Sequence, residues 1–149
     1  MSEDVREAIL ARILVVLQGI PGETDVARNL IVNDDLSPHR LVLLDGSEDC
    51  DSLADLNRPP LVQRITRMYP LVNVASMAKA RDLGAGLSSR RGKIIKAIEG
   101  DSALIALTAK NDGGRYIGID NALLAQGLLP LGDMPMKFVF AYMLRPSQF

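Results

Sequence analysis

The C-terminal segment MKFVFAYML alternates between two sets of side chains, and this alternation limits the fold more than any other feature of the chain. Successive side chains of a β-strand point to opposite faces, so a strand here places its largest residues on one face. These residues are Met136, Phe138, Phe140, Tyr142 and Leu144. Such a face is stable only when another layer covers it, and we expect a helix of the same chain to do so.

The start of the chain predicts an amphipathic helix. Apolar residues recur in steps of four or three, the spacing that places them on one side of an α-helix. They are Val5, Ile9, Ile13, Val16 and Ile20. We expect Ser2 to be the N-cap, with acidic residues in the first turn, and residues 19–22 to end the helix because they contain two glycines and a proline.

A second helix is predicted to begin near Leu87 and to end at Gly100. One of its faces is apolar and the other side is basic. The apolar face holds Leu87, Ile94, Ile95 and Ile98, and the basic residues are Arg90, Arg91, Lys93 and Lys96. We interpret these basic residues as a solvated helix face rather than as a contact with DNA or RNA.

The other strands are predicted from short apolar runs between turn residues, over residues 26–32, 41–44 and 115–119, and residues 61–77 are predicted to form one long strand or two in a row. The continuous run 41–44 is typical of a strand that is covered on both faces. Pro70 lacks an N–H group, so we expect it at an edge position or at a bulge. Asp101 is expected to cap a short helix.

Two segments are predicted to be loops, residues 45–60 and residues 127–135, and Asp45 with Gly46 is expected to close the strand before the first of them. The predicted class is therefore α+β. We expect a mostly antiparallel mixed sheet on which an N-terminal helix and one central helix pack.

Length and charge narrow the possible functions. A chain of 149 residues fits one domain, predicted to span residues 1–149. Seventeen basic and eighteen acidic residues leave a net charge of −1, whereas proteins that grip nucleic acid usually show a basic excess. No apolar run approaches the roughly 18–20 residues that span a bilayer. We expect no specific nucleic-acid binding, no membrane partner, no signal peptide and a cytoplasmic site of synthesis.

The residues that usually carry catalysis are scarce. His39 is the only histidine and Cys50 the only cysteine, which leaves too few ligands for a zinc site and no disulfide. Acidic neighbours of Cys50 disfavour a thiolate there. The glycine pairs near residues 84–86 and 113–114 lack the flanking residues of a phosphate-binding loop. We therefore expect no enzyme activity, no cofactor and no metal.

The acidic residues of the 45–51 segment leave one enzymatic alternative open. Asp45, Glu48 and Asp49 are the carboxylates that a small metal-dependent nuclease would need for a divalent cation. Their spacing matches no EF-hand loop. Charge on a solvated loop is the favoured interpretation.

The order of segments resembles the tail terminators of long-tailed bacteriophages, the small minor tail proteins found in siphophages and Mu-like phages. The segments that carry the likeness span nearly the whole chain. They are REAILARILVVLQGIPG, VARN, LVLLDGSE, VQRITRMYPLVNV, IIKAIEGDSALIAL, NDGGRYIG and MKFVFAYML.

The resemblance implies a structural virion protein in the phage tail, assembled in the host cytoplasm. Its subunits would form a ring, usually a hexamer, at the head-proximal end of the tail tube. The implied partners are further copies of the chain, the tail tube protein and a head-tail connector or neck protein, and DNA would pass through the ring lumen. Another neck or tail-completion protein and a dimeric adaptor remain alternatives.

Association surfaces usually contain aromatic anchors, adaptable methionines and charged loop residues. The candidate interface residues chosen on this basis are Asp45, Glu48, Asp49, Arg58, Met134, Tyr142 and Phe149.

Overall fold

The computed structural model describes residues 4–29, 39–50, 61–75, 80–120 and 133–149, with the backbone alone for residues 80–85 and 148. Its strands form one sheet in the order β1-β2-β3-β5-β4. β1 and β2 are parallel, and the other neighbouring strands are antiparallel. In chain order the elements are α1 (Val5–Gln18), β1 (Val26–Arg28), β2 (Arg40–Cys50), β3 (Arg64–Ala75), α2 (Ala80–Glu99), α3 (Ser102–Leu107), the 3-10 turn η2 (Ala109–Asn111), β4 (Arg115–Ile119), β5 (Met134–Leu144) and the 3-10 turn η3 (Pro146–Gln148).

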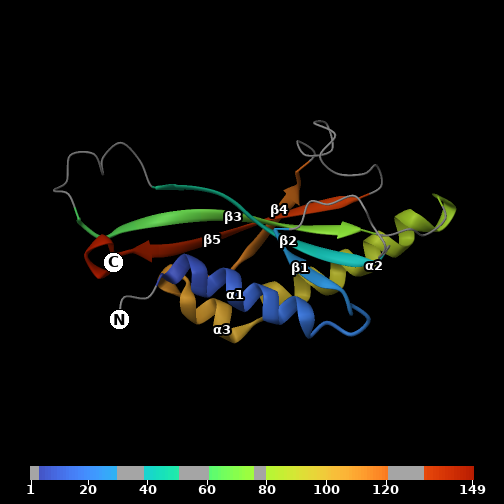
Figure 1. Ribbon diagram of the computed structural model, residues 1–149, viewed down its shortest axis with the longest axis horizontal. Coiled ribbons are helices and arrows are strands. Elements are labelled where there is room, and N and C mark those ends of the chain that lie inside the picture. The colour runs from blue at the N-terminus through green and yellow to red at the C-terminus, as the bar shows by residue number, and fades with distance from the viewer. Residues whose placement is uncertain (1–3, 30–38, 51–60, 76–79, 121–132) are drawn as a thin grey trace.

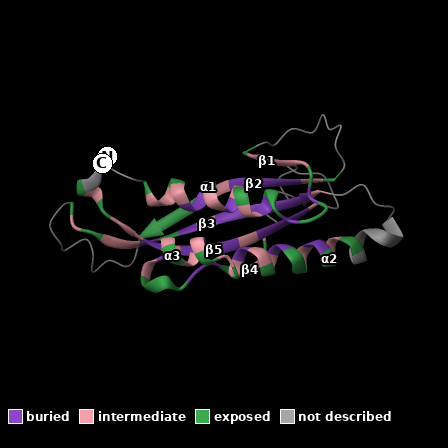
Figure 2. Ribbon diagram, turned by 90° about the horizontal axis from the view of Figure 1, so that it is seen from below, coloured by how far each residue is buried: buried purple, intermediate pink, exposed green. Residues whose placement is uncertain are grey.

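The helices all lie on one face of the sheet (Figure 1). Seen from that side, β3 and β5 are largely buried where they run between α1 and the α2–α3 segment (Figure 2). The predicted α+β class, with an N-terminal and a central helix on a mostly antiparallel mixed sheet, is confirmed. None of the helices in the described ranges is long and apolar enough to cross a membrane.

The alternation in the last strand is confirmed. Met136, Phe138 and Phe140 are completely buried and Tyr142 is nearly so, in one core cluster with residues of α1 and α2. Helix α1 contributes Ile9, Leu10, Ile13 and Leu17 to this core, and Val16 of the predicted stripe is only partly buried.

Helix α1 begins later than predicted. Its N-cap is Asp4 rather than Ser2, and the Asp4 carboxylate accepts a hydrogen bond from the backbone N–H of Arg6 at 3.1 Å. A carboxylate at this position also interacts favourably with the helix dipole, which a serine hydroxyl does less well.

Strand β2 continues through residues 45–50, so the prediction that Asp45 and Gly46 close it and begin a loop is wrong. The register of β2 against β3 shifts between Leu44 and Ser47, which places a bulge opposite Pro70. Gly46 has a φ of 73° there. Because proline has no N–H to donate and glycine tolerates positive φ, the two residues suit a bulge. Of the two placements predicted for Pro70, the bulge is correct.

The two faces of β2 are both buried at its start, as predicted. Leu41 and Leu43 belong to the main core, and Val42 and Leu44 form a second buried cluster with Leu71.

Other helix and strand boundaries also differ from the predicted ones. Helix α2 begins at Ala80 rather than near Leu87, because the packing of its later turns outweighs a cost of about 1 kcal/mol for each glycine near its start. Strand β5 begins at Met134, inside the predicted 127–135 loop. Strand β1 ends at Arg28, and residues 30–32 lie outside the described residues. The 115–119 strand and the Asp101 cap of α3 are confirmed.

Candidate interaction site

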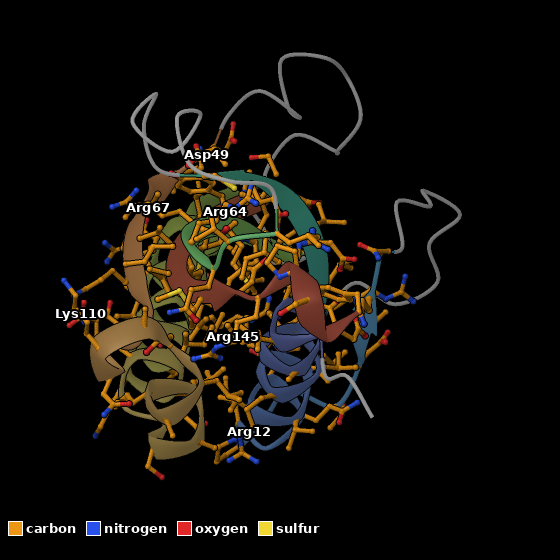
Figure 3. The ribbon with its side chains drawn as sticks, turned by 90° about the vertical axis from the view of Figure 1, so that its left-hand side faces the viewer. Arg12, Asp49, Arg64, Arg67, Lys110 and Arg145 are labelled. Atoms are coloured by element: carbon orange, nitrogen blue, oxygen red, sulfur yellow. The ribbon has the colours of Figure 1, made fainter. Side chains whose placement is uncertain are left out.

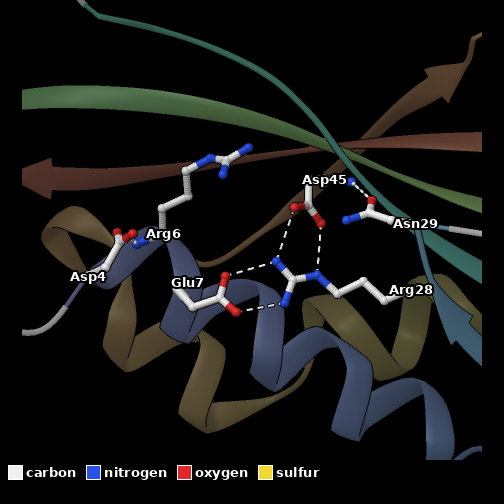
Figure 4. Close-up of polar contacts among 6 residues, drawn as sticks. All are labelled: Asp4, Arg6, Glu7, Arg28, Asn29 and Asp45. Atoms are coloured by element: carbon white, nitrogen blue, oxygen red, sulfur yellow. Dashed lines mark hydrogen bonds and ion pairs between the residues drawn. The ribbon is translucent and has the colours of Figure 1, made fainter.

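An arginine of strand β1 joins the N-terminal helix to the bulge of β2. Arg28 donates hydrogen bonds to both carboxylate oxygens of Glu7 on α1, at 2.6 and 2.8 Å. Its remaining donors reach both oxygens of Asp45, at 2.9 and 3.0 Å. The backbone N–H of Asp45 donates to the side chain of Asn29 at 3.0 Å, which completes the arrangement in Figure 4. We call Glu7, Arg28 and Asp45 the Arg28 cluster.

A second arginine, Arg6, lies beside this cluster and also links helix α1 to strand β2. Arg6 Nε lies 3.0 Å from Glu48 Oε2, an ion pair whose angle is too poor for a hydrogen bond. The Tyr142 hydroxyl donates to the same Glu48 oxygen at 3.0 Å. Glu48 therefore links Arg6 of helix α1 to Tyr142 of strand β5.

The charges around Arg28 are fixed rather than poised for proton transfer. Hydrogen bonds from Arg28 lower the pKa of both Glu7 and Asp45, and the two carboxylates raise the pKa of Arg28. Burial, with help from Glu48, raises the pKa of the Tyr142 hydroxyl. All four pKa shifts favour the charge state that each group already has at neutral pH: the two carboxylates and the guanidinium stay charged, and the tyrosine stays neutral. The arrangement can hold a shape and a charge pattern.

We expect acid to destabilise the protein through these carboxylates. The ordinary pKa is 4.5 for Glu7 and 3.8 for Asp45, and hydrogen bonds from Arg28 lower both in the folded state. The unfolded chain therefore binds more protons than the folded one in this range, so the stabilisation is present above these values and is lost as pH falls through the lower, folded ones. Urea unfolding midpoints should fall steadily below about pH 5.

The Asp45→Asn variant should show a shallower decline in the same titration. Asp112→Asn serves as the control, because Asp112 is exposed and forms no ion pair within the described residues. If the urea midpoint fell equally steeply with pH in the parent and in both variants, the assignment of acid sensitivity to the Arg28 cluster would be contradicted.

The predicted interface residues do not form one group. Asp45 and Glu48 lie in or beside the Arg28 cluster, whereas Asp49 accepts a hydrogen bond from the Tyr69 hydroxyl at 3.4 Å. Phe149 is 68% exposed. Met134 and Tyr142 are buried, so within a single chain they face the core. Arg58 lies outside the described residues. A contact of any of these seven with another subunit stays a prediction.

The carboxylates of the nuclease alternative are committed to other partners. Asp45 is held by Arg28, and Glu48 by Arg6 and Tyr142. Among the described residues, three or more metal-binding side chains nowhere gather into a possible ion site. Cys50 lies at the exposed end of β2 with its sulfur 3.3 Å from the Thr66 hydroxyl. Nothing in this geometry favours the metal-dependent alternative.

One polar pair that the sequence analysis missed lies in the interior. Arg90 was predicted on a solvated face, but it is only 7% exposed, as is Glu23. Arg90 donates to both oxygens of Glu23 at 2.8 Å and to the backbone carbonyls of Ala75 and Arg40 at 2.6 and 3.3 Å. A signal existed: Arg90 follows Leu87 by three residues and precedes Ile94 by four, which is the spacing of the apolar face.

The described residues thus form a helical layer on one face of a sheet, with charged groups held by hydrogen bonds. The fold of the chain is similar to that of a known terminator. That protein is the sheath/tube terminator, in the extended state, of the extracellular contractile injection system PVC, solved by cryo-EM. The TM-score is 0.52 and the sequence identity 8%, over 97% of this chain and 58% of the other.

At 8% identity the likeness shows a shared fold. The chain spans 58% of the length of the PVC protein. No family model matches the sequence, and no curated protein matches it either.

Proposed function

We propose that this protein is a tail terminator, a structural virion protein that forms a ring at the head-proximal end of a phage tail tube. The ring would stop tube polymerisation and join the tail to the head connector. One observation carries the proposal: 97% of the chain aligns with the fold of a sheath/tube terminator. The order of segments along the sequence agrees with it, because it resembles phage tail terminators independently of the structure.

The proposed mechanism is shape complementarity between rigid surfaces. Copies that contact one another head to tail close into a ring when the rotation between them is right, and one face of that ring would match the tube end while the other matches the neck. The Arg28 cluster supports such rigidity, because it ties α1, β1 and β2 together through charged hydrogen bonds. We propose a hexamer, with the tube protein and a neck protein as partners and DNA passing through the lumen.

The decisive test compares tails assembled with and without the protein. We expect tails of uniform length in its presence, and overlong tails that attach to no heads in its absence, by negative-stain electron microscopy. Normal tail length with failed head attachment would instead indicate another neck or completion protein.

Mass in solution provides a second measurement. Light scattering after size exclusion should give a hexamer of 16.2 kDa subunits, or a monomer that forms rings only on tube ends. A tight dimer with metal-dependent cleavage of nucleic acid would contradict the proposal.

A further inference from the structure

A groove runs between helices α1 and α2 on the side of the helical layer that faces away from the sheet core. Its volume is about 750 Å³. Val15, Val16 and Ile20 line it from the first helix and its end, and Lys93, Lys96 and Ala97 line it from the second. The Arg28 cluster does not contribute to it, so the groove is separate from the site described above.

The floor of the groove is apolar beyond what the core requires. Helix α1 contains the continuous apolar run Ile13 to Leu17, of which Ile13 and Leu17 are buried in the core. Val15 points the other way and is 52% exposed. A surface helix normally carries polar residues on its outer face, so the exposed Val15 beside the partly buried Val16 leaves apolar surface in the groove that the core does not bury.

The rim of the groove carries two lysines. Lys93 and Lys96 are exposed, and neither forms an ion pair with any residue in the described part of the chain. Among the described residues, Asp101 is the one carboxylate that lines the groove, and it already has hydrogen-bond partners. It accepts two hydrogen bonds from Arg12, at 2.8 and 2.9 Å, and one from the Leu104 N–H at 3.0 Å. Arg12 lies between α1 and the α2–α3 segment (Figure 3).

The shape of the walls selects a helix as the occupant. Its long sides are turns of α1 and α2, which offer an incoming chain no free strand edge to pair with. A helix satisfies its backbone itself and needs only apolar contact. Gly19, Ala97 and Gly100 line the groove and have little or no side chain, which permits a close approach of a third helix axis, at about 8–10 Å.

We propose that this groove binds an amphipathic helix of a partner protein, with apolar residues against Val15 and Val16 and acidic residues against Lys93 and Lys96. A second copy's α2 does not fit this chemistry, because its lysines would meet the same lysines. The proposal does not depend on the terminator function, since the groove is complete in a single chain.

Binding to designed peptides tests the proposal on the full chain. The probe is a fluorescein-labelled peptide of about 18 residues, long enough to be partly helical, with leucines on one face and glutamates flanking them. The comparison peptide carries lysine in place of every glutamate. Fluorescence anisotropy should show saturable binding of the glutamate peptide, weakened by salt, and binding of the lysine peptide at least about tenfold weaker.

Variants separate the groove from the rest of the surface. Lys93→Glu with Lys96→Glu should weaken binding of the glutamate peptide about tenfold or more and should favour the lysine peptide. Val15→Ser should weaken both peptides, because it removes apolar contact without adding a charge. Lys93→Arg with Lys96→Arg should bind as the parent does. Lys110→Glu is the control, because Lys110 is exposed on η2 and points away from α1 (Figure 3).

The proposal is overturned if neither peptide binds, if the two peptides bind equally, or if Lys110→Glu weakens binding as much as the double charge reversal. Tail-length measurements do not enter this test, so its failure leaves the proposed function standing, and failure of that function leaves the groove result standing.

Discussion

Replacing Arg90 by methionine is expected to lower the free energy of unfolding by about 3–5 kcal/mol, because removing one partner of a buried ion pair leaves the other charge buried without compensation. Within the described residues, the Glu23 carboxylate would keep only the His39 ring, whose Nε2 lies 3.4 Å away on a half-exposed side chain. The carbonyls of Ala75 and Arg40 would lose their donors as well. Urea unfolding followed by circular dichroism measures the loss.

Two further variants show that the loss comes from the pair. Arg91→Met removes the next arginine of the same helix, which stacks on the Tyr116 ring at 4.7 Å from its centre, and it should cost only about 1 kcal/mol. Arg90→Met combined with Glu23→Met should recover part of the stability lost in the single variant, since a buried pair replaced by apolar residues is often neutral. A loss at Arg90 no larger than the loss at Arg91 would refute the assignment.

Gly46→Ala is expected to cost about 2–5 kcal/mol, from two separate causes. The φ of 73° is strained for any residue with a side chain, and a Cβ at this position would lie 1.9 Å from the Tyr69 carbonyl oxygen. That oxygen belongs to the backbone of central strand β3, so it cannot move aside without disturbing the pairing of β2 with β3. Thermal and urea unfolding of the variant measure the loss.

Gly22→Ala separates the two causes. Gly22 has a φ of 89°, and nothing lies within 4 Å of an added Cβ, so this variant suffers the backbone strain without the collision. We expect it to lose about 1–2 kcal/mol, clearly less than Gly46→Ala. Equal losses for the two variants would mean that the bulge opposite Pro70 tolerates a side chain, contrary to the geometry.

Local patterns in the sequence determined the elements whose cause is local. The period of two over residues 136–144 predicts β5 and its buried face, because alternation follows from strand geometry alone. The N-terminal period of three and four predicts α1, and Asp101 predicts the start of α3, since a cap bonds a residue three positions away. Together these were sufficient for the α+β class.

The tertiary structure decided which distant residues meet. Arg28 lies 21 residues from Glu7 and 17 from Asp45, and Arg90 lies 67 from Glu23, so no local spacing indicates either pairing. The extension of β2 beyond Gly46 has the same origin: Asp45 and Gly46 are typical turn residues, and only their register opposite Pro70 turns them into a bulge. Turn and helix propensities act between near neighbours, whereas burial and strand pairing depend on the whole chain. At Gly46 and Arg90, pairing and burial outweighed the local propensities.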